Sequence, residues 1–166
     1  FVFTSDNGPV VDRLGGSDLY SMSKAGAELA VAAYRRSFFP PERLAEHGVA
    51  MATARAGNVF GGGDWVADRL VPDCFRALLE GRPIVVRSPE AVRPWQHVLD
   101  PLSGYLLLGA RLFHGDVAAR ARACEAWNFG PATGNARPVH ELVGALVAAW
   151  GEGSWCTESS PDAPHE

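Results

Sequence analysis

The chain has 166 residues, of which 47% are hydrophobic and 20% are charged, a composition typical of a globular domain with its own core. A formal net charge of -4 and scattered arginines argue against a nucleic-acid partner. No stretch of the sequence approaches the roughly 18 apolar residues of a membrane span, so we expect no membrane association. The three cysteines and five histidines have no metal-ligand spacing. They indicate reduced thiols, a cytoplasmic location and no metal site.

The first segment, residues 1–6, is predicted to be a short apolar strand that ends in hydroxyls and a carboxylate. Ligands of open parallel sheets bind outside the carboxyl ends of the strands, so Ser5 and Asp6 are candidate site residues. A loop with several Gly and Pro residues follows over 7–17. Because the chain starts directly in a strand and without Met, we expect it to be part of a longer protein or the product of a gene broken at both ends.

A helix is predicted from Leu19 towards Tyr34. It opens with Tyr20 and Lys24, whose spacing places them on one face, one turn apart. An ammonium near a phenol favours the phenolate, so Tyr20 is a candidate proton acceptor near neutral pH. The alternative is an ordinary helix in which Tyr20 is half-buried and Lys24 is solvated. Small residues at successive turns indicate either a tight subunit interface or simple packing on the sheet.

A second buried strand is predicted over 49–55, continuous in its apolar character as parallel strands tend to be. It leads into Ala56 and Asn58. An Asn in this place either binds a sugar hydroxyl or phosphate or simply forms a turn. The three glycines at 61–63 are a weak pattern for a phosphate loop and favour a tight turn.

The rest of the chain alternates between amphipathic helices and short strands. Helices are predicted over 68–80, about 100–113 and 139–150, and strands over 84–86 and 126–131, with a loose polar tail beyond Gly151. Arg69 and Arg93 are candidate clamps for a pyrophosphate, which a guanidinium fork suits well. For either arginine the alternative is a surface ion pair.

Together these pieces resemble one family of the extended short-chain dehydrogenase/reductase superfamily, the CDP-glucose 4,6-dehydratases. The resemblance covers nearly the whole chain. Its main stretches are Thr-Ser-Asp at 4–6, Tyr-Ser-Met-Ser-Lys at 20–24, Ala-Arg-Ala-Gly-Asn-Val at 54–59, Gly-Gly-Gly-Asp-Trp at 61–65, Arg-Pro-Trp-Gln-His-Val at 93–98 and Ala-Trp-Asn-Phe-Gly-Pro at 126–131. The Tyr-x-x-x-Lys pattern alone is specific only to the superfamily.

The resemblance implies an α/β fold: the second half of a Rossmann-type parallel-sheet domain plus a small α/β substrate-binding lobe. Residues 1–60 are then a partial NAD-binding domain without its amino-terminal half, and 61–166 are the lobe together with closing elements of the sheet. The glycine-rich turn that would hold the pyrophosphate of NAD is not part of this sequence. We therefore expect no measurable NAD binding by the isolated chain.

The implied activity is a lyase reaction that uses NAD catalytically and converts CDP-glucose to CDP-4-keto-6-deoxyglucose. By the resemblance, Tyr20 takes the proton of the 4-hydroxyl while hydride leaves C4 for NAD, and the hydride later returns to C6. Lys24 holds the nicotinamide ribose, and Ser5 hydrogen-bonds the reacting oxygen. Asp6 protonates the departing 6-hydroxyl. Asn7 stands where the family usually has Lys and related dehydratases have Glu. An amide cannot take up the proton of C5 near pH 7, so elimination is expected to be slow.

The resemblance also implies binding residues and partners. Tyr20, Lys24 and Ala56 would bind the cofactor. The nucleotide-sugar site would consist of Asn58, Arg69, Arg93 and Asn128. A homo-oligomer is expected through the helix that carries Tyr20. The alternatives are another sugar-nucleotide epimerase or dehydratase of the same branch, or a catalytically silent fragment that at most binds nucleotide-sugar.

Overall fold

The computed structural model describes residues 2–5, 19–131 and 136–157. By its internal packing the chain forms two compact units. Unit 1 consists of 1–59 and 96–130, and unit 2 of 60–95 and 131–166. The chain thus returns to unit 1 at Gln96, whereas the expected division by role was placed at residue 60. That division by role stays a prediction.

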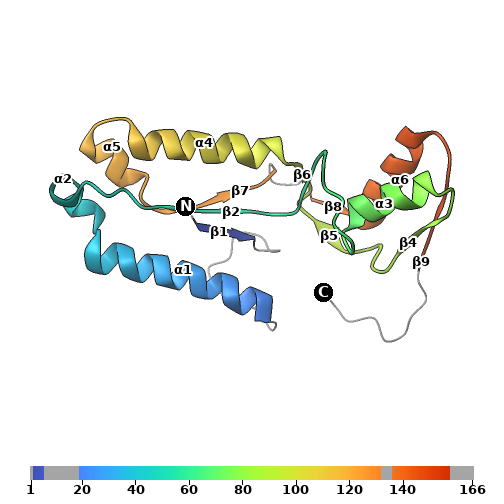
Figure 1. The fold of residues 1–166 in the computed structure, drawn as a ribbon, viewed down its shortest axis with the longest axis horizontal. Coiled ribbons are helices and arrows are strands. Elements are labelled where there is room, and N and C mark those ends of the chain that lie inside the picture. The colour runs from blue at the N-terminus through green and yellow to red at the C-terminus, as the bar shows by residue number, and fades with distance from the viewer. Residues whose placement is uncertain (1, 6–18, 132–135, 158–166) are drawn as a thin grey trace. The chain divides into compact units, whose positions relative to one another are not determined.

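Unit 1 is built on three parallel strands in the order β1-β2-β7, with α1 on one side and α4 on the other (Figure 1). Its elements are β1 (Val2–Ser5), α1 (Leu19–Phe38), the 3-10 turn η1 (Pro41–Arg43), α2 (Leu44–His47), β2 (Thr53–Ala56), β6 (Gln96–His97), α4 (Leu99–Phe113), α5 (Val117–Arg122) and β7 (Ala126–Phe129). The short strand β3 (Val59–Phe60) pairs with β6.

The two faces of β2 differ because successive side chains of a strand point to opposite sides. Ala54 of β2, together with Ala52 just before the strand, belongs to a buried apolar cluster with Leu108 of α4 and with Ala123. Around this cluster pack three larger side chains, Tyr105, Leu112 and Phe129. Small residues on β2 therefore let α4 approach the sheet closely. The opposite face of β2 carries Thr53 and is polar.

Unit 2 has a separate apolar core, made of Cys74, Ala77, Leu78, Ile84, Val86, Val139 and Val143. Its elements are α3 (Leu70–Leu79), β4 (Ile84–Val86), β5 (Val92–Arg93), β8 (Arg137–Pro138), α6 (Val139–Trp150) and β9 (Trp155–Thr157). The strands form two small pairs: β4 runs parallel to β9, and β5 runs antiparallel to β8. In β4 the outer two residues are buried and the middle one is exposed, so one face lies on the core.

The predicted α/β class is confirmed, and the predicted helices over 68–80, 100–113 and 139–150 are present as α3, α4 and α6. The strand expected over 49–55 is shorter and lies at Thr53–Ala56. The prediction of a loose tail directly after Gly151 is wrong in one part, since β9 pairs with β4. A three-residue strand that pairs with a segment far back in the chain leaves no local pattern to detect.

Candidate functional site

The carboxyl ends of the three parallel strands lie in one row. Ser5 pairs in register with Ala56, and Ala56 pairs with Phe129. Asn58 follows two residues beyond the end of β2, and Asn128 precedes the end of β7 by one residue. Unit 1 thus brings these expected positions to one edge of its sheet, as predicted for a ligand site. The side chain of Ser5, and the whole of Asp6 and Asn7, lie outside the described residues.

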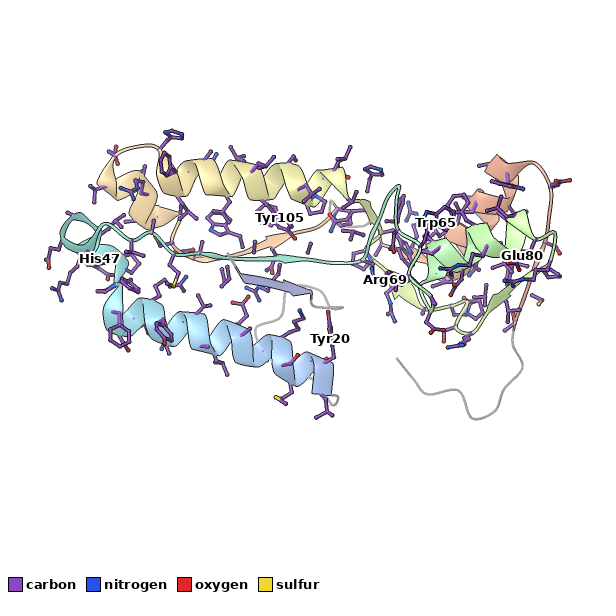
Figure 2. The ribbon with its side chains drawn as sticks, in the orientation of Figure 1. Tyr20, His47, Trp65, Arg69, Glu80 and Tyr105 are labelled. Atoms are coloured by element: carbon purple, nitrogen blue, oxygen red, sulfur yellow. The ribbon has the colours of Figure 1, made fainter. Side chains whose placement is uncertain are left out.

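Tyr20 and Lys24 lie on the first turns of α1, the helix that follows β1 in the chain. Figure 2 shows Tyr20 on this helix. The Lys24 Nζ atom is 5.2 Å from the centroid of the Tyr20 ring. Tyr20 is 53% exposed, so its phenol is not part of the apolar core. The spacing therefore produces the predicted neighbourhood of ammonium and phenol. The catalytic roles of the two residues stay a prediction.

Gln96 links the segment after β2 to the end of β7. Its backbone N–H donates to the carbonyl of Asn58 at 3.1 Å, and its side-chain Nε2 donates to the carbonyl of Phe129 at 3.1 Å. Gln96 is only 6% exposed. Sequence reasoning missed this residue as an organiser of the edge. It lay within the quoted stretch at 93–98, but nothing local shows where its amide points.

The side-chain amide of Asn58 has a buried oxygen atom that lacks a hydrogen-bond donor among the described residues. Its Oδ1 atom is buried and accepts no hydrogen bond from any residue that the structure describes. A buried amide oxygen without a donor costs free energy, about 1–3 kcal/mol. A donor from a bound molecule, such as a sugar hydroxyl, would remove this cost. Between the two interpretations that the sequence left open, this observation favours ligand binding over simple turn formation.

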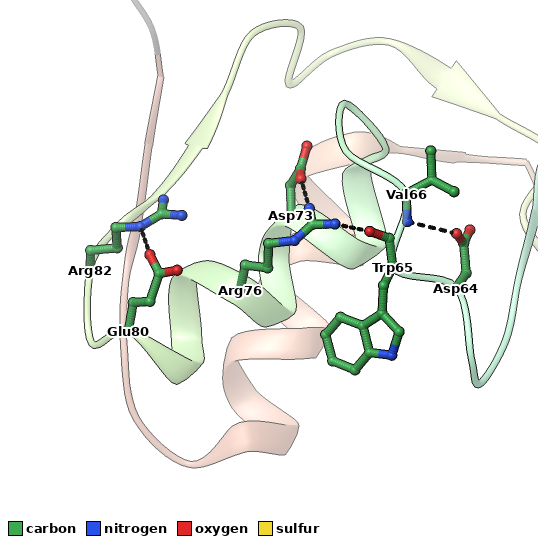
Figure 3. A network of polar contacts seen from close by, with 7 residues as sticks. All are labelled: Asp64, Trp65, Val66, Asp73, Arg76, Glu80 and Arg82. Atoms are coloured by element: carbon green, nitrogen blue, oxygen red, sulfur yellow. Dashed lines mark hydrogen bonds and ion pairs between the residues drawn. The ribbon is translucent and has the colours of Figure 1, made fainter.

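In unit 2, Arg69 precedes α3 and keeps an accessible head group. Its side chain is 60% exposed, and its Nη1 lies 3.4 Å from Oδ2 of Asp64. The loop before it is held to α3 by Arg76, which donates to the carbonyl of Trp65 and also pairs with Asp73 (Figure 3). The loop therefore presents an exposed guanidinium, whose ion-pair partner among the described residues is the partly exposed carboxylate of Asp64.

Arg93 stands in β5 directly opposite Arg137 of β8. Like charges at opposed positions of an antiparallel pair are destabilising unless an anion balances them. Glu141 supplies part of this balance, since its Oε2 is 3.5 Å from Nε of Arg137.

Residues 2–5, 19–131 and 136–157 contain no group of three or more His, Cys, Asp or Glu side chains that could hold a metal ion. No helix among them is both long and apolar enough to cross a membrane.

Burial, with a smaller contribution from Asp73, raises the pKa of the Cys74 thiol to about 11.

One curated relative is the CDP-glucose 4,6-dehydratase of Salmonella typhimurium, 46% identical over 156 residues. The match takes in 93% of this chain and 42% of the relative, and it corresponds to a carboxyl-terminal portion. The chain thus spans less than half the length of the curated relative it matches.

Solved structures of similar fold include a dTDP-glucose 4,6-dehydratase from Bacillus anthracis in complex with NAD. It has a TM-score of 0.66 at 21% identity, with 93% of this chain and 45% of that chain covered. A UDP-glucuronic acid 4-epimerase from Bacillus cereus has a TM-score of 0.68 at 15% identity, with 95% and 48% covered. These likenesses show the fold: this chain is the second half of a Rossmann-type α/β domain with a small α/β lobe.

A match to a family as a whole covers more than half of the sequence. Residues 5–119, which include the Tyr-x-x-x-Lys helix and the ends of β1 and β2, match the NAD dependent epimerase/dehydratase family. With the relative from Salmonella and the common fold, this establishes that the chain belongs to the NAD dependent epimerase/dehydratase family.

Proposed function

We propose that this chain supplies the catalytic and nucleotide-sugar-binding part of an NAD-dependent dehydratase that converts CDP-glucose to CDP-4-keto-6-deoxyglucose. The observation that carries the proposal is the meeting of Ser5 and Ala56 at one sheet edge, with Tyr20 and Lys24 on the helix that follows β1. The 46% identity to a CDP-glucose 4,6-dehydratase supports the choice of reaction and of the CDP-sugar.

The residues at this edge fit the nicotinamide end of NAD. Ala56 has no side chain beyond Cβ, so the backbone at the end of β2 is open to a flat ring, and Lys24 offers an ammonium to a ribose hydroxyl. NAD, when bound, supplies the acceptor and later the donor of the hydride. Tyr20 accepts the proton of the sugar 4-hydroxyl. After C5 has lost its proton to another residue or a water, Asp6 donates a proton to the departing 6-hydroxyl.

The nucleotide-sugar is proposed to be bound by four residues, Asn58, Asn128, Arg69 and Arg93. Asn58 has a buried oxygen that lacks a donor among the described residues. Arg69 is exposed, and Arg93 stands opposite a second arginine, so both suit the diphosphate. Cysteines without disulfides at 74, 124 and 156 support a cytoplasmic location.

A homo-oligomer is proposed through α1 because this helix carries large apolar side chains that are exposed. Five large ones are exposed: Leu19, Met22, Leu29, Tyr34 and Phe38. A helix face of this kind is stabilised when a second copy covers it. Light scattering coupled to gel filtration tests this. Leu29→Lys should shift the mass towards that of the monomer. An unchanged oligomer would show that the interface does not involve this part of α1.

The proposed activity is tested in a fusion protein in which the amino-terminal part of the Salmonella relative precedes this chain. We expect it to form the 4-keto-6-deoxy product from CDP-glucose, detected by chromatography of the nucleotide-sugars. Tyr20→Phe should lower the turnover by about 10²–10⁴, as expected for loss of a general base. The matched control is Tyr34→Phe, which changes a tyrosine of the same helix and similar exposure and should retain the turnover.

The products distinguish the alternatives. A C4 epimer formed without loss of water would favour an epimerase of the same branch. Binding of CDP-glucose in calorimetry, without any product, would favour a catalytically silent fragment. Equal activities of the Tyr20→Phe and Tyr34→Phe proteins would contradict the assigned base.

A further inference from the structure

Helix α1 has an unusual contact with the sheet. Within this helix, all of which the structure describes, Glu28 is the one residue that is fully buried, at 6% exposure. Large apolar side chains of the helix, among them Leu29, lie exposed instead. A buried carboxylate is costly unless it is paired and hydrogen-bonded. The buried carboxylate of Glu28 therefore needs hydrogen-bonding or charged partners on the sheet.

Two partners of Glu28 come from β2. The hydroxyl of Thr53 donates to Glu28 Oε2 at 2.8 Å, and Arg55 Nε lies 3.6 Å from Glu28 Oε1. Thr53 is 2% exposed, and the side chain of Arg55 is 13% exposed. Because the two are separated by one residue, they project from the same face of the strand. The Glu28 carboxylate thus contacts two successive side chains on that face of β2.

This arrangement fixes the position of the helix along the strand. Apolar burial is non-directional, whereas a hydrogen bond and an ion pair to two given residues are formed in one register. The opposite face of β2 has no such contact in the described unit, since Ala52 and Ala54 meet α4 through apolar side chains. The polar contact is therefore confined to the side of the sheet that carries α1.

The same carboxylate lies in line with the proposed catalytic pair. Tyr20, Lys24 and Glu28 are spaced by four residues and follow one stripe of α1. On the strand, Arg55 directly precedes Ala56, at the edge where the proposed cofactor and substrate positions begin. The contact thus joins the helix that carries the base to the strand that ends at the site.

We propose that Glu28 is a positioning residue, which through Thr53 and Arg55 sets the register of α1 on β2 and thereby places Tyr20 and Lys24 at the carboxyl edge. Glu28 acts through these residues and takes no part in proton transfer. Its effect on turnover rests on the proposed function, whereas its effect on the position of Tyr20 does not.

The position of Tyr20 is tested in the unfused chain by NMR, with ¹³C at Cζ of tyrosine. The chain has three tyrosines, at 20, 34 and 105, and Tyr→Phe variants assign their signals. Glu28→Gln, Glu28→Ala and Thr53→Val should move the Tyr20 signal, while Tyr105 on α4 keeps its own. Glu28→Gln should move it less than Glu28→Ala, because the amide oxygen still accepts from Thr53. If Glu28→Ala fails to fold, Glu28→Gln and Thr53→Val decide.

The matched control is Glu46→Ala, which removes a glutamate that also pairs with an arginine of unit 1 but lies on the surface, 61% exposed. It should leave all three signals in place. A Tyr20 signal that stays fixed in folded Glu28→Gln and Thr53→Val proteins would overturn the inference, since the contact would then only stabilise the fold.

Turnover gives the second readout, in the fusion protein. Glu28→Gln should lower kcat by about 10²-fold, the effect of a small misplacement of reacting groups, and leave the KM for CDP-glucose nearly unchanged. An unchanged kcat per folded molecule would contradict positioning. If the unchanged fusion protein makes no product, the proposed function fails, and the NMR experiment alone decides the role of Glu28.

Discussion

Replacing Gly104 with alanine should destabilise unit 1, although alanine is the better helix former. Gly104 lies inside α4, where Gly→Ala alone stabilises a helix by about 1 kcal/mol. A Cβ atom at this position would lie 2.3 Å from both Cδ1 and Cε1 of Phe129. Carbon atoms prefer about 3.5–4.0 Å, so the ring or the helix has to move by more than an ångström.

The ring cannot simply turn aside. Phe129 packs edge-to-face on Tyr105, with the ring centroids 5.1 Å apart, against the buried cluster of unit 1. Overpacking of this kind costs about 1–3 kcal/mol, so after the gain in helix propensity we expect a net loss of about 1 kcal/mol. Because Phe129 is also the last residue of β7, the strain falls on the edge of the sheet.

Hydrogen exchange followed by mass spectrometry measures this loss within unit 1. Amides of α4 should exchange about fivefold faster in Gly104→Ala, the factor that corresponds to about 1 kcal/mol. Peptides from α6 in unit 2 serve as an internal reference. The control is Gly26→Ala in α1, where an added Cβ meets nothing within 4 Å and the exchange of α1 should slow.

A second variant identifies the cause. Phe129→Leu gives the added methyl group more room, so the double variant should be more stable than the sum of the single changes predicts. Additive effects would mean that Gly104 and Phe129 do not clash. Slower exchange of α4 in Gly104→Ala would refute the reasoning outright.

Three further predictions concern the core, a thiol and a helix cap. Ile84→Ala should destabilise unit 2 by about 2–5 kcal/mol in urea unfolding, because Ile84 is 2% exposed, whereas the exposed neighbour Val85→Ala should change stability by less than about 0.5 kcal/mol; equal effects would contradict the assigned core. Burial raises the pKa of Cys74 to about 11, so its thiol should resist alkylation at pH 8 while the exposed Cys156 reacts. The folded state keeps the thiol proton to a higher pH than the unfolded state does. This contribution to stability should therefore be complete below about pH 9 and fall as the pH rises towards 11. Rapid alkylation of Cys74 in the folded chain, read by peptide mapping, would disprove its burial. Asp116 accepts from the N–H of Ala119 at 2.7 Å and caps α5, so Asp116→Ala should cost about 0.5–2 kcal/mol and Asp116→Asn much less, as measured by thermal unfolding.

Local patterns in the sequence were sufficient for the long elements and for the family. Apolar spacing located α3, α4 and α6, because a helix that packs on a core repeats its apolar residues with the period of the helix itself. The spacing of Tyr20 and Lys24 likewise determined that they share a face of α1. The stretches around them identified the family, later matched over residues 5–119.

Contacts between distant segments were decided only in the tertiary structure. The sequence places Thr53 and Arg55 in an ordinary buried strand. No nearby residue indicates that both side chains contact Glu28. In the same way, the two hydrogen bonds of Gln96 and the pairing of β9 with β4 join residues far apart in the chain. Periodicity records which side of its own element a residue occupies, whereas a buried polar group takes its partner from whichever element the fold brings against it.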